Sequence, residues 1–394
     1  MKQKSFSLTA RACYVGYITQ AIVNNYIPLL FLTFEQQYGL SLDTIALLIS
    51  CNFATQLAVD LLSIRLMEKI SCRTAIVGAH ILAGTGLILL GVLPQLMANK
   101  FAALLIAVIV CAVGGGLLEV LVSPIIEACP FERKASAMSL LHSFYCWGSV
   151  LVILLSTGFF AWFGVAAWPY MACIWAIIPL ANAVVFTQAP LAPLQSEGTG
   201  MPLRALLRDK RVWLLALLML CAGAAELCVS QWASAFTESG LHVSKATGDL
   251  LGPCLFAVIM GIARVLYARF SDRLPLKKSI FGSSLLCCLS YLLISLSPWP
   301  WLSLAGCALC GFSCGILWPG TISLAARYFP ESGTSLFALL ALFGDCGCAA
   351  GPALIGIAAS AAGGSLQSGL LCGILFPVLL LLGILPLLRK KTVK

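Results

Sequence analysis

Six ionisable side chains lie within long apolar segments of the sequence. They are Asp60, Glu119, Glu127, Glu226, Arg264 and Asp345. An ionised group at the centre of a bilayer costs at least about 2.5–3.5 kcal/mol, so each such residue is a functional candidate. A carboxyl group that is occluded in one state and wetted in another can release and take up a proton. Glu127, one turn from the end of its segment, is expected at the membrane interface.

The remaining five differ in their expected depth. Counted from the segment ends, Glu119, Glu226 and Asp345 lie nearest the middle, while Asp60 and Arg264 lie nearer one end. Because a guanidinium group stays charged when buried, Arg264 needs a counter-charge. The candidates for it are Asp345, Glu119 and Asp60. Such a pair either gates a conformational cycle or is a permanent structural pair, and the sequence leaves both open.

Polar residues recur at helical spacing in three segments and form three stripes. The stripes are Asn52, Gln56 and Asp60; Glu119, Ser123 and Glu127; and His142, Tyr145 and Ser149. Each set occupies one face of a helix. Such faces either line a water-filled path or satisfy one another between packed helices. With three stripes in one half of the chain, we expect a hydrophilic cavity.

Amide and tryptophan side chains add possible ligand contacts. Gln20, Asn24 and Asn25 stand at mid-depth in the first segment, and amides both donate to and accept from hydroxyl groups. Trp318 could stack on a ligand, although packing in the protein interior is the more ordinary role. The candidate substrate contacts are Asn24, Asn25, Gln56, Tyr145, Glu226, Gln231 and Trp318.

The chain has 18 cysteines, almost all inside apolar segments. Pairs such as Cys307 and Cys310 could form a metal or redox site, but no histidine or carboxylate accompanies them at ligand spacing. We therefore expect the cysteines to serve as small apolar packing residues, with no metal site, no cofactor and no disulfide framework.

The composition identifies the elements that must carry these residues. Of 394 residues, 60% are apolar or aromatic and 10% are charged, and the mean hydropathy is +1.00. Soluble domains carry about 25% charge, so a soluble core is excluded and the chain is integral to a membrane. A spanning helix needs about 20 apolar residues. The segments near 12–34, 43–66, 74–97, 101–128, 135–161, 166–187, 212–236, 247–269, 278–297, 301–327, 333–361 and 366–388 qualify.

Twelve transmembrane helices predict an all-α fold, since barrel strands are about 10 residues long and alternate in polarity. Two stretches without charge, 135–187 and 279–326, must be helical hairpins that turn at Trp162 to Pro169 and at Ser297 to Pro300. Of the 24 Lys and Arg residues, 21 fall in alternate loops and tails. The positive-inside rule then places both termini in the cytoplasm. The net charge of +9 is thus a sign of topology and not of nucleic-acid binding.

The chain divides into two similar halves. A polar stretch at 188–211 separates a six-helix bundle at 1–187 from a second at 212–394. The loop that begins Glu68-Lys69 matches the loop that begins Asp272-Arg273, and the same offset aligns Asp60 with Arg264. These halves predict two pseudo-symmetric bundles joined by a cytoplasmic linker.

The two loops resemble the signature Gly-x-x-x-Asp-Arg-x-Gly-Arg-Arg of the major facilitator superfamily. The second copy keeps Asp272-Arg273, whereas the first has Glu68-Lys69. The resemblance implies two bundles related by an axis along the membrane normal, a substrate site between them near the midplane, and alternating access by rocking. It also implies a set of gating charges, for which the candidates are Asp60, Arg264, Asp345, Asp272 and Arg273.

A narrower resemblance covers about 35 residues. The segment from Gly114 to Pro124, with Glu119 at its centre, looks like the helix 4 motif Gly-x-Gly-x-Leu-Glu-x-x-x-Asn-Pro of the fucose/galactose/glucose proton symporters. The stretch from Leu140 to Gly148 is similar to that family's helix 5. The resemblance implies that Glu119 couples protons and that His142 is a substrate or relay residue. Imidazole has the titration range to relay a proton, so we hypothesise a couple between these two residues.

These features favour a secondary transporter that moves a small polar solute, a sugar or sugar-like molecule, by proton symport. A proton-driven exporter of amphipathic, drug-like compounds is the alternative. A membrane enzyme or receptor is disfavoured because the sequence has no nucleotide-binding loop or zinc motif, and a channel because nothing resembles a repeated selectivity filter. The expected partners are the solute, protons and the bilayer. We expect a monomer in a bacterial cytoplasmic membrane, because the loops are short and lack Asn-x-Ser/Thr sites.

Overall fold

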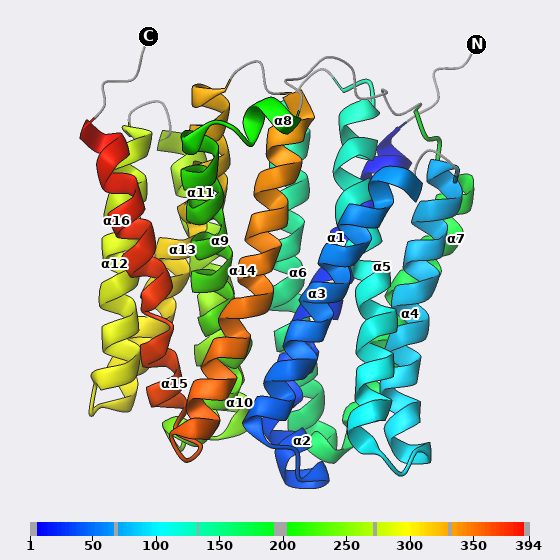
Figure 1. The fold of residues 1–394 in the computed structure, drawn as a ribbon. Helices are drawn as coiled ribbons and strands as arrows, with labels where there is room; N and C mark the ends of the chain where they lie inside the picture. The colour runs from blue at the N-terminus through cyan, green and yellow to red at the C-terminus, as the bar shows by residue number, and fades with distance from the viewer. Residues whose placement is uncertain are drawn as a thin grey trace. The chain divides into compact units, whose positions relative to one another are not determined.

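A computed structural model of the chain describes residues 6–66, 70–131, 134–192, 203–270, 274–329 and 333–389. Every regular element in these ranges is a helix (Figure 1). Twelve helical segments within them are long and apolar enough to cross a membrane, one for each predicted span. Both stretches without charge form the predicted hairpins. The first turns through Gly164, and the second through residues 297–299.

The chain forms two compact units by its internal contacts. The first unit comprises Met1–Leu40 and Cys51–Ser196. Its helices are α1 (Ser7–Asn25), η1 (Ile27–Leu30), α2 (Phe31–Tyr38), most of α3 (Leu42–Leu66), α4 (Cys72–Leu96), α5 (Lys100–Ala128), α6 (Lys134–Phe163), η2 (Val165–Ala167) and α7 (Trp168–Gln188).

The second unit comprises Ser41–Ser50 and Glu197–Lys394. In this unit Ser50, in the first part of α3, donates a hydrogen bond to the carbonyl oxygen of Ala349 at 3.4 Å. Its other helices are α8 (Leu203–Leu206), α9 (Lys210–Ala235), η3 (Phe236–Gly240), α10 (Lys245–Asp249), η4 (Leu250–Cys254), α11 (Leu255–Phe270), α12 (Leu276–Leu296), α13 (Pro300–Tyr328), α14 (Gly333–Ala361), α15 (Leu366–Cys372) and α16 (Leu375–Arg389).

Side-chain caps fix several helix starts near the membrane ends. Ser71 accepts a hydrogen bond from the backbone of Thr74, and Asn99 accepts one from Ala102. Asp209 caps α9. Its carboxylate also accepts a hydrogen bond from the guanidinium of Arg211, with Nη2 and Oδ2 2.6 Å apart. These hydrogen bonds hold the pKa of the Asp209 carboxyl below its usual range. These caps therefore fix where α4, α5 and α9 begin.

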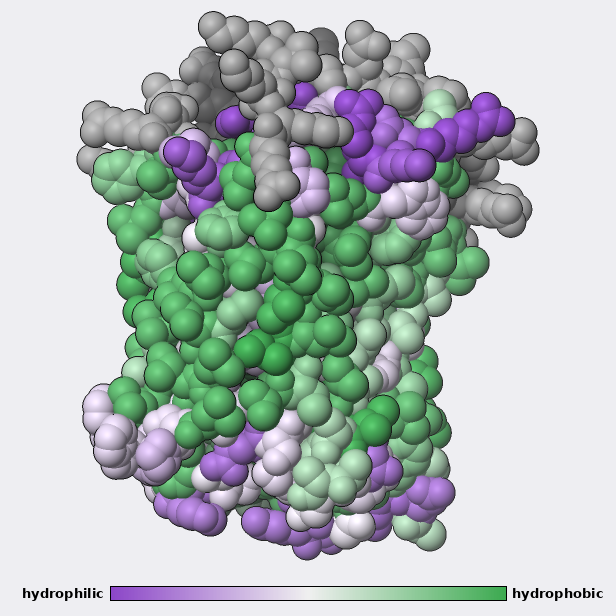
Figure 2. Space-filling model, turned by 60° about the vertical axis from the view of Figure 1, so that its left-hand side comes forward, coloured by the Kyte–Doolittle hydropathy of each residue, from purple (hydrophilic) through white to green (hydrophobic). Residues whose placement is uncertain are grey.

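The outer surface of the second unit is suited to lipid. Figure 2 shows apolar side chains across the middle of one face, with hydrophilic residues gathered at its two ends. Four leucines of α12 are exposed at helical spacing, namely Leu285, Leu289, Leu292 and Leu296. In water, such a continuous apolar face would promote aggregation, whereas in a bilayer it can contact lipid directly.

Glycines on α5 allow the helices of the first unit to approach closely. A Cβ atom at Gly114 would lie 2.5 Å from the backbone nitrogen of Ala83 and 2.7 Å from the carbonyl oxygen of Ala79. At Gly116 a Cβ atom would lie 3.0 Å from the Cα of Gln56. Close approach of this kind is how small residues bring transmembrane helices together. The glycines thus place Glu119, just beyond them, against α1 and α3.

We expect Gly114→Ala to destabilise the protein, because the neighbouring atoms belong to the backbone of α4 and cannot rotate away. Overpacking of this kind costs about 1–3 kcal/mol. The unfolding midpoint of the purified protein should fall, as measured by tryptophan fluorescence during heating. Gly78→Ala is the matched control, since no heavy atom lies within 4 Å of its added Cβ. Equal midpoints for the two variants would contradict the prediction.

Candidate functional site

Glu119 of α5 lies beside α1 in the first unit. Gln20 of α1 is buried and donates a hydrogen bond from Nε2 to Oε2 of Glu119 at 2.6 Å. The carboxylate of Asp60, on α3, lies close enough to interact electrostatically with Glu119. Three helices therefore bring an amide and two carboxyl groups together. The sequence indicated both carboxyl groups, but it gave no reason to pair Glu119 with Gln20.

The amide side chains of α1 continue this polar site. The Oδ1 atom of Asn24 accepts hydrogen bonds from Asn52 at 3.2 Å and from Gln56 at 2.9 Å. Its Nδ2 atom lies 3.5 Å from the hydroxyl of Tyr145. All three amides are buried. Asn24 of α1 thus contacts residues of two predicted stripes, and these side chains form hydrogen bonds with one another.

Asn25 makes a second contact with α6, donating to the hydroxyl of Ser149 at 3.1 Å. Together with Asn24 and Tyr145, this contact brings four of the residues predicted from the stripes and the first segment to the boundary of α1 and α6. The polar groups are therefore arranged around α1, which is the central helix of the described site in this unit.

His142 of α6 contacts the aromatic ring of Tyr17 on α1. The imidazole is exposed, and its ring centroid lies 5.3 Å from that of Tyr17. The Tyr17 hydroxyl in turn pairs with Ser123 at 2.9 Å, one turn from Glu119 on α5. Tyr17, which was not among the predicted residues, therefore contacts both His142 and Ser123. The hypothesised couple between Glu119 and His142 stays a prediction.

In the second unit, Arg264 of α11 pairs with Glu226 of α9. The Nη2 and Oε2 atoms are 3.6 Å apart, with side chains that are 28% and 12% exposed. Glu226 was not among the expected counter-charges, which were Asp345, Glu119 and Asp60. Those three residues were candidates only because of their expected depth in the membrane. Two residues of sequence-adjacent spanning segments meet only if both helices have the right rotation, which depth does not give.

The other predicted residues of this unit lie on α9, α13 and α14. Trp318 packs where glycines make room for it, and a Cβ at Gly223 would lie 3.1 Å from its ring. Gln231 is buried, and Asp345 is 8% exposed. Asp272 and Arg273, the predicted gating charges of the loop, lie outside the described residues.

A buried polar cluster near the junction of α9 and α10 was not expected from the sequence. Asp249 is fully buried and accepts a hydrogen bond from Ser234. Lys245 approaches Asp249 at 3.3 Å and Glu238 at 3.7 Å. The spacing of Lys245 and Asp249, four residues apart, could have indicated it. Two π-helical turns, η3 and η4, flank the cluster in the chain.

The accepting oxygen of Asn24 has a measurable role in stability. We expect Asn24→Leu to be much more destabilising than Gln56→Met. The first change leaves two buried amide donors without this acceptor, at about 1–3 kcal/mol each. The change Gln56→Met removes one donor, while Asn52 still donates a hydrogen bond to Oδ1 of Asn24. Unfolding midpoints of the two purified variants test this order, and the reverse order would contradict it.

A family model described as Major Facilitator Superfamily matches residues 13–254 and 241–394. A search of curated proteins finds no significant match.

Solved structures share the fold at low sequence identity. A crystal structure of the nucleoside transporter NupG has a TM-score of 0.78 at 12% identity, covering 97% of this chain and 100% of that one. A bacterial homolog of the human lysosomal transporter Spinster has a TM-score of 0.73 at 15% identity, covering 97% of each chain. The Escherichia coli fucose:proton symporter FucP has a TM-score of 0.66 at 16% identity, covering 99% and 100%. At these identities, the likeness is one of fold.

Proposed function

Because this chain belongs to the major facilitator superfamily, we propose that it moves a small polar solute, a sugar or sugar-like molecule, by proton-coupled symport. Transporters of this superfamily bind small molecules in a membrane, and they are not enzymes. The observation that carries the proposal is the polar cluster around α1, in which Glu119 meets Gln20 and Asn24 meets two further amides.

The amide cluster supports a solute rich in hydroxyl groups. Asn24, Asn52 and Gln56 bind one another in the first unit. Each can exchange an internal hydrogen bond for one to a hydroxyl, because an amide both donates and accepts. Two of the proteins with a similar fold are named for fucose and for nucleosides, which both contain a sugar ring. A sugar ring is thus the chemical group that we propose the site recognises.

Gln20 supports a role for Glu119 in proton coupling. Its Nε2 donates to the carboxylate, while its Oε1 has no hydrogen-bond partner among the described residues. After a rotation of the amide, Oε1 could accept from a protonated Glu119. The same neighbour can therefore stabilise both forms of the carboxyl group. We propose that Glu119 carries the coupled proton, and that Tyr17 and His142 lie on its route.

We further propose a monomer in a bacterial cytoplasmic membrane with both termini in the cytoplasm. The support for this orientation is that 21 of the 24 basic residues fall in alternate connections and tails. Fluorescent proteins fused to either end should fluoresce, because they fold in the cytoplasm but not after export in unfolded form. Light scattering of the purified protein tests the monomer.

A panel of ligands tests the proposed substrate class. Purified protein should be stabilised against heating by at least one sugar or nucleoside, and not by amino acids or cationic drugs. The stabilising solute, in radioactive form, should then accumulate in proteoliposomes under an imposed proton gradient. Stabilisation by cationic drugs alone would overturn the proposal.

An exporter of amphipathic compounds is the second candidate, and one observation favours it. Trp318 is partly exposed on α13, although part of its ring packs against glycines of neighbouring helices. An indole in such a place can stack on the apolar face of a drug-like cation. The drug arm of the same panel separates the two functions.

A further inference from the structure

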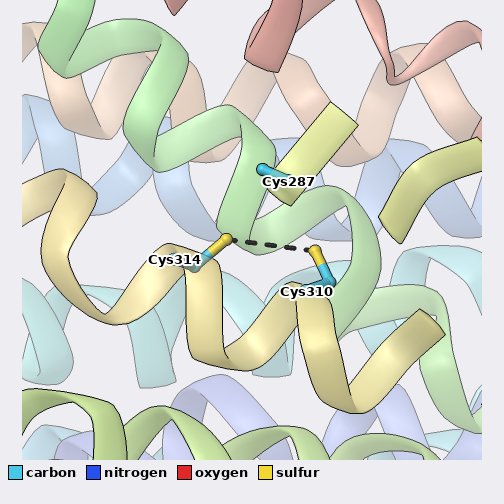
Figure 3. A group of neighbouring side chains, drawn as sticks. All are labelled: Cys287, Cys310 and Cys314. Carbon is cyan, nitrogen blue, oxygen red and sulfur yellow. Dashed lines mark hydrogen bonds between the residues drawn. The ribbon is translucent and has the colours of Figure 1, made fainter. Parts of the chain in front are cut away.

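Three cysteine thiols converge inside the second unit. Cys310 and Cys314 lie one turn apart on α13, and Cys287 comes from the neighbouring helix α12 (Figure 3). All three side chains are 0% exposed. Their sulfur atoms lie within 4.8 Å of one another, and those of Cys310 and Cys314 are 4.0 Å apart. The structure thus brings together sulfur atoms that sequence spacing alone left unrelated.

The spacing of the sulfur atoms suits a single metal ion. In a trigonal arrangement with metal–sulfur bonds of about 2.3 Å, the sulfur atoms are about 4.0 Å apart. The pair on α13 already has this separation, and the remaining separations require movements of less than about an ångström. Packing alone would require only that three small side chains fit. It would not require their sulfur atoms to meet at one point.

We propose that Cys287, Cys310 and Cys314 form a binding site for a thiophilic monovalent cation, Cu⁺. Soft thiolate ligands select Cu⁺ and Zn²⁺ among common metal ions. Structural Zn²⁺ sites are almost always four-coordinate, whereas this cluster offers three donors among the described His, Cys, Asp and Glu side chains. A site with three sulfur donors is therefore better suited to Cu⁺.

Metal binding uses cysteines as thiolates, so each cysteine that binds Cu⁺ in this form releases its proton to water.

The site lies beside the ion pair of the same unit. The carboxylate of Glu226 is close enough to Cys314 to interact with it electrostatically, and Glu226 pairs with Arg264. A bound ion would also tie α12 to α13 at this point. The Cu⁺ site is therefore next to the polar residues of the transporter, although it is independent of the solute and proton proposals.

Copper retention by the full-length protein tests the site. Reduced protein in detergent is incubated without oxygen with Cu⁺ and a competing chelator, and then desalted. We expect one copper per chain by mass spectrometry. The variant Cys287→Ser/Cys310→Ser/Cys314→Ser should lose it. The matched control Cys111→Ser/Cys221→Ser/Cys307→Ser removes three other buried thiols outside the cluster and should retain it.

Equal copper in the cluster variant and the control would overturn the site. A second measurement holds even if the triple variant fails to fold. X-ray absorption of the copper-loaded protein should count three sulfur neighbours in the wild type and fewer in Cys287→Ser alone. A sulfur count unchanged by Cys287→Ser, or the absence of retained copper in the wild type, would likewise reject the proposal.

Discussion

Replacement of Glu119 by glutamine is expected to abolish uptake driven by a proton gradient and to leave solute exchange intact. A glutamine has the shape of the carboxyl group and can still bind Gln20, which now donates to Oε2 of Glu119 at 2.6 Å. It cannot bind or release a proton between pH 5 and 9. The variant should therefore be folded, and solute movement should be uncoupled from protons.

Two assays on the same proteoliposomes separate these effects. Concentrative uptake of the labelled solute under an imposed proton gradient should fall to the level of empty liposomes. Counterflow, in which internal unlabelled solute exchanges for external labelled solute without a gradient, should persist. Glu127→Gln is the matched control, since this carboxyl group is on the same helix but exposed near its end. Concentrative uptake by Glu119→Gln at the wild-type rate would show that Glu119 does not carry the coupled proton.

The twelve spans were predictable because each is a long apolar segment with charges or turn residues at its ends. Gly164, in the turn between α6 and α7, has a φ of +80°, which glycine adopts without strain. The exact ends of the irregular spans were not predictable. The chain crosses from α9 into η3, and from η4 into α11, without a break in hydropathy. A π-helical turn changes the rotation of the next helical residues but leaves their composition unchanged.

The residues of the site could be found from sequence, but not their partners. A polar residue in an apolar segment is evident, and its depth follows from counting. The direction in which it points depends on how each helix is rotated and which neighbour it meets. For this reason Gln20 was not expected at Glu119, and Cys287 was not expected at Cys310 and Cys314. Glycines such as Gly114 let a helix approach residues that are distant in sequence, and the sequence does not show which residues these are.

Glu226→Gln is expected to have the second large effect, this time on stability. The change removes the negative charge of Glu226, whose Oε2 lies 3.6 Å from Nη2 of Arg264. Removing one partner of a buried pair costs about 3–5 kcal/mol. Because the side chain of Arg264 is 28% exposed, we expect a smaller cost, about 2 kcal/mol. The unfolding midpoint of the purified variant should fall well below that of Lys278→Met, which removes an exposed charge from the same unit.

The neutral double variant Glu226→Gln/Arg264→Met identifies the cause. If the single change acts by removing this counter-charge of Arg264, removing the charge of Arg264 as well should restore most of the lost stability. The coupling energy in the double-mutant cycle should then be about 0.5–3 kcal/mol. The reversed pair Glu226→Arg/Arg264→Glu should also recover stability, because the attraction survives the exchange. If the double variant is instead as unstable as the sum of its single changes, the two residues do not act as a pair. That result would show that Glu226 does not stabilise the charge of Arg264 in the membrane-spanning part of α11.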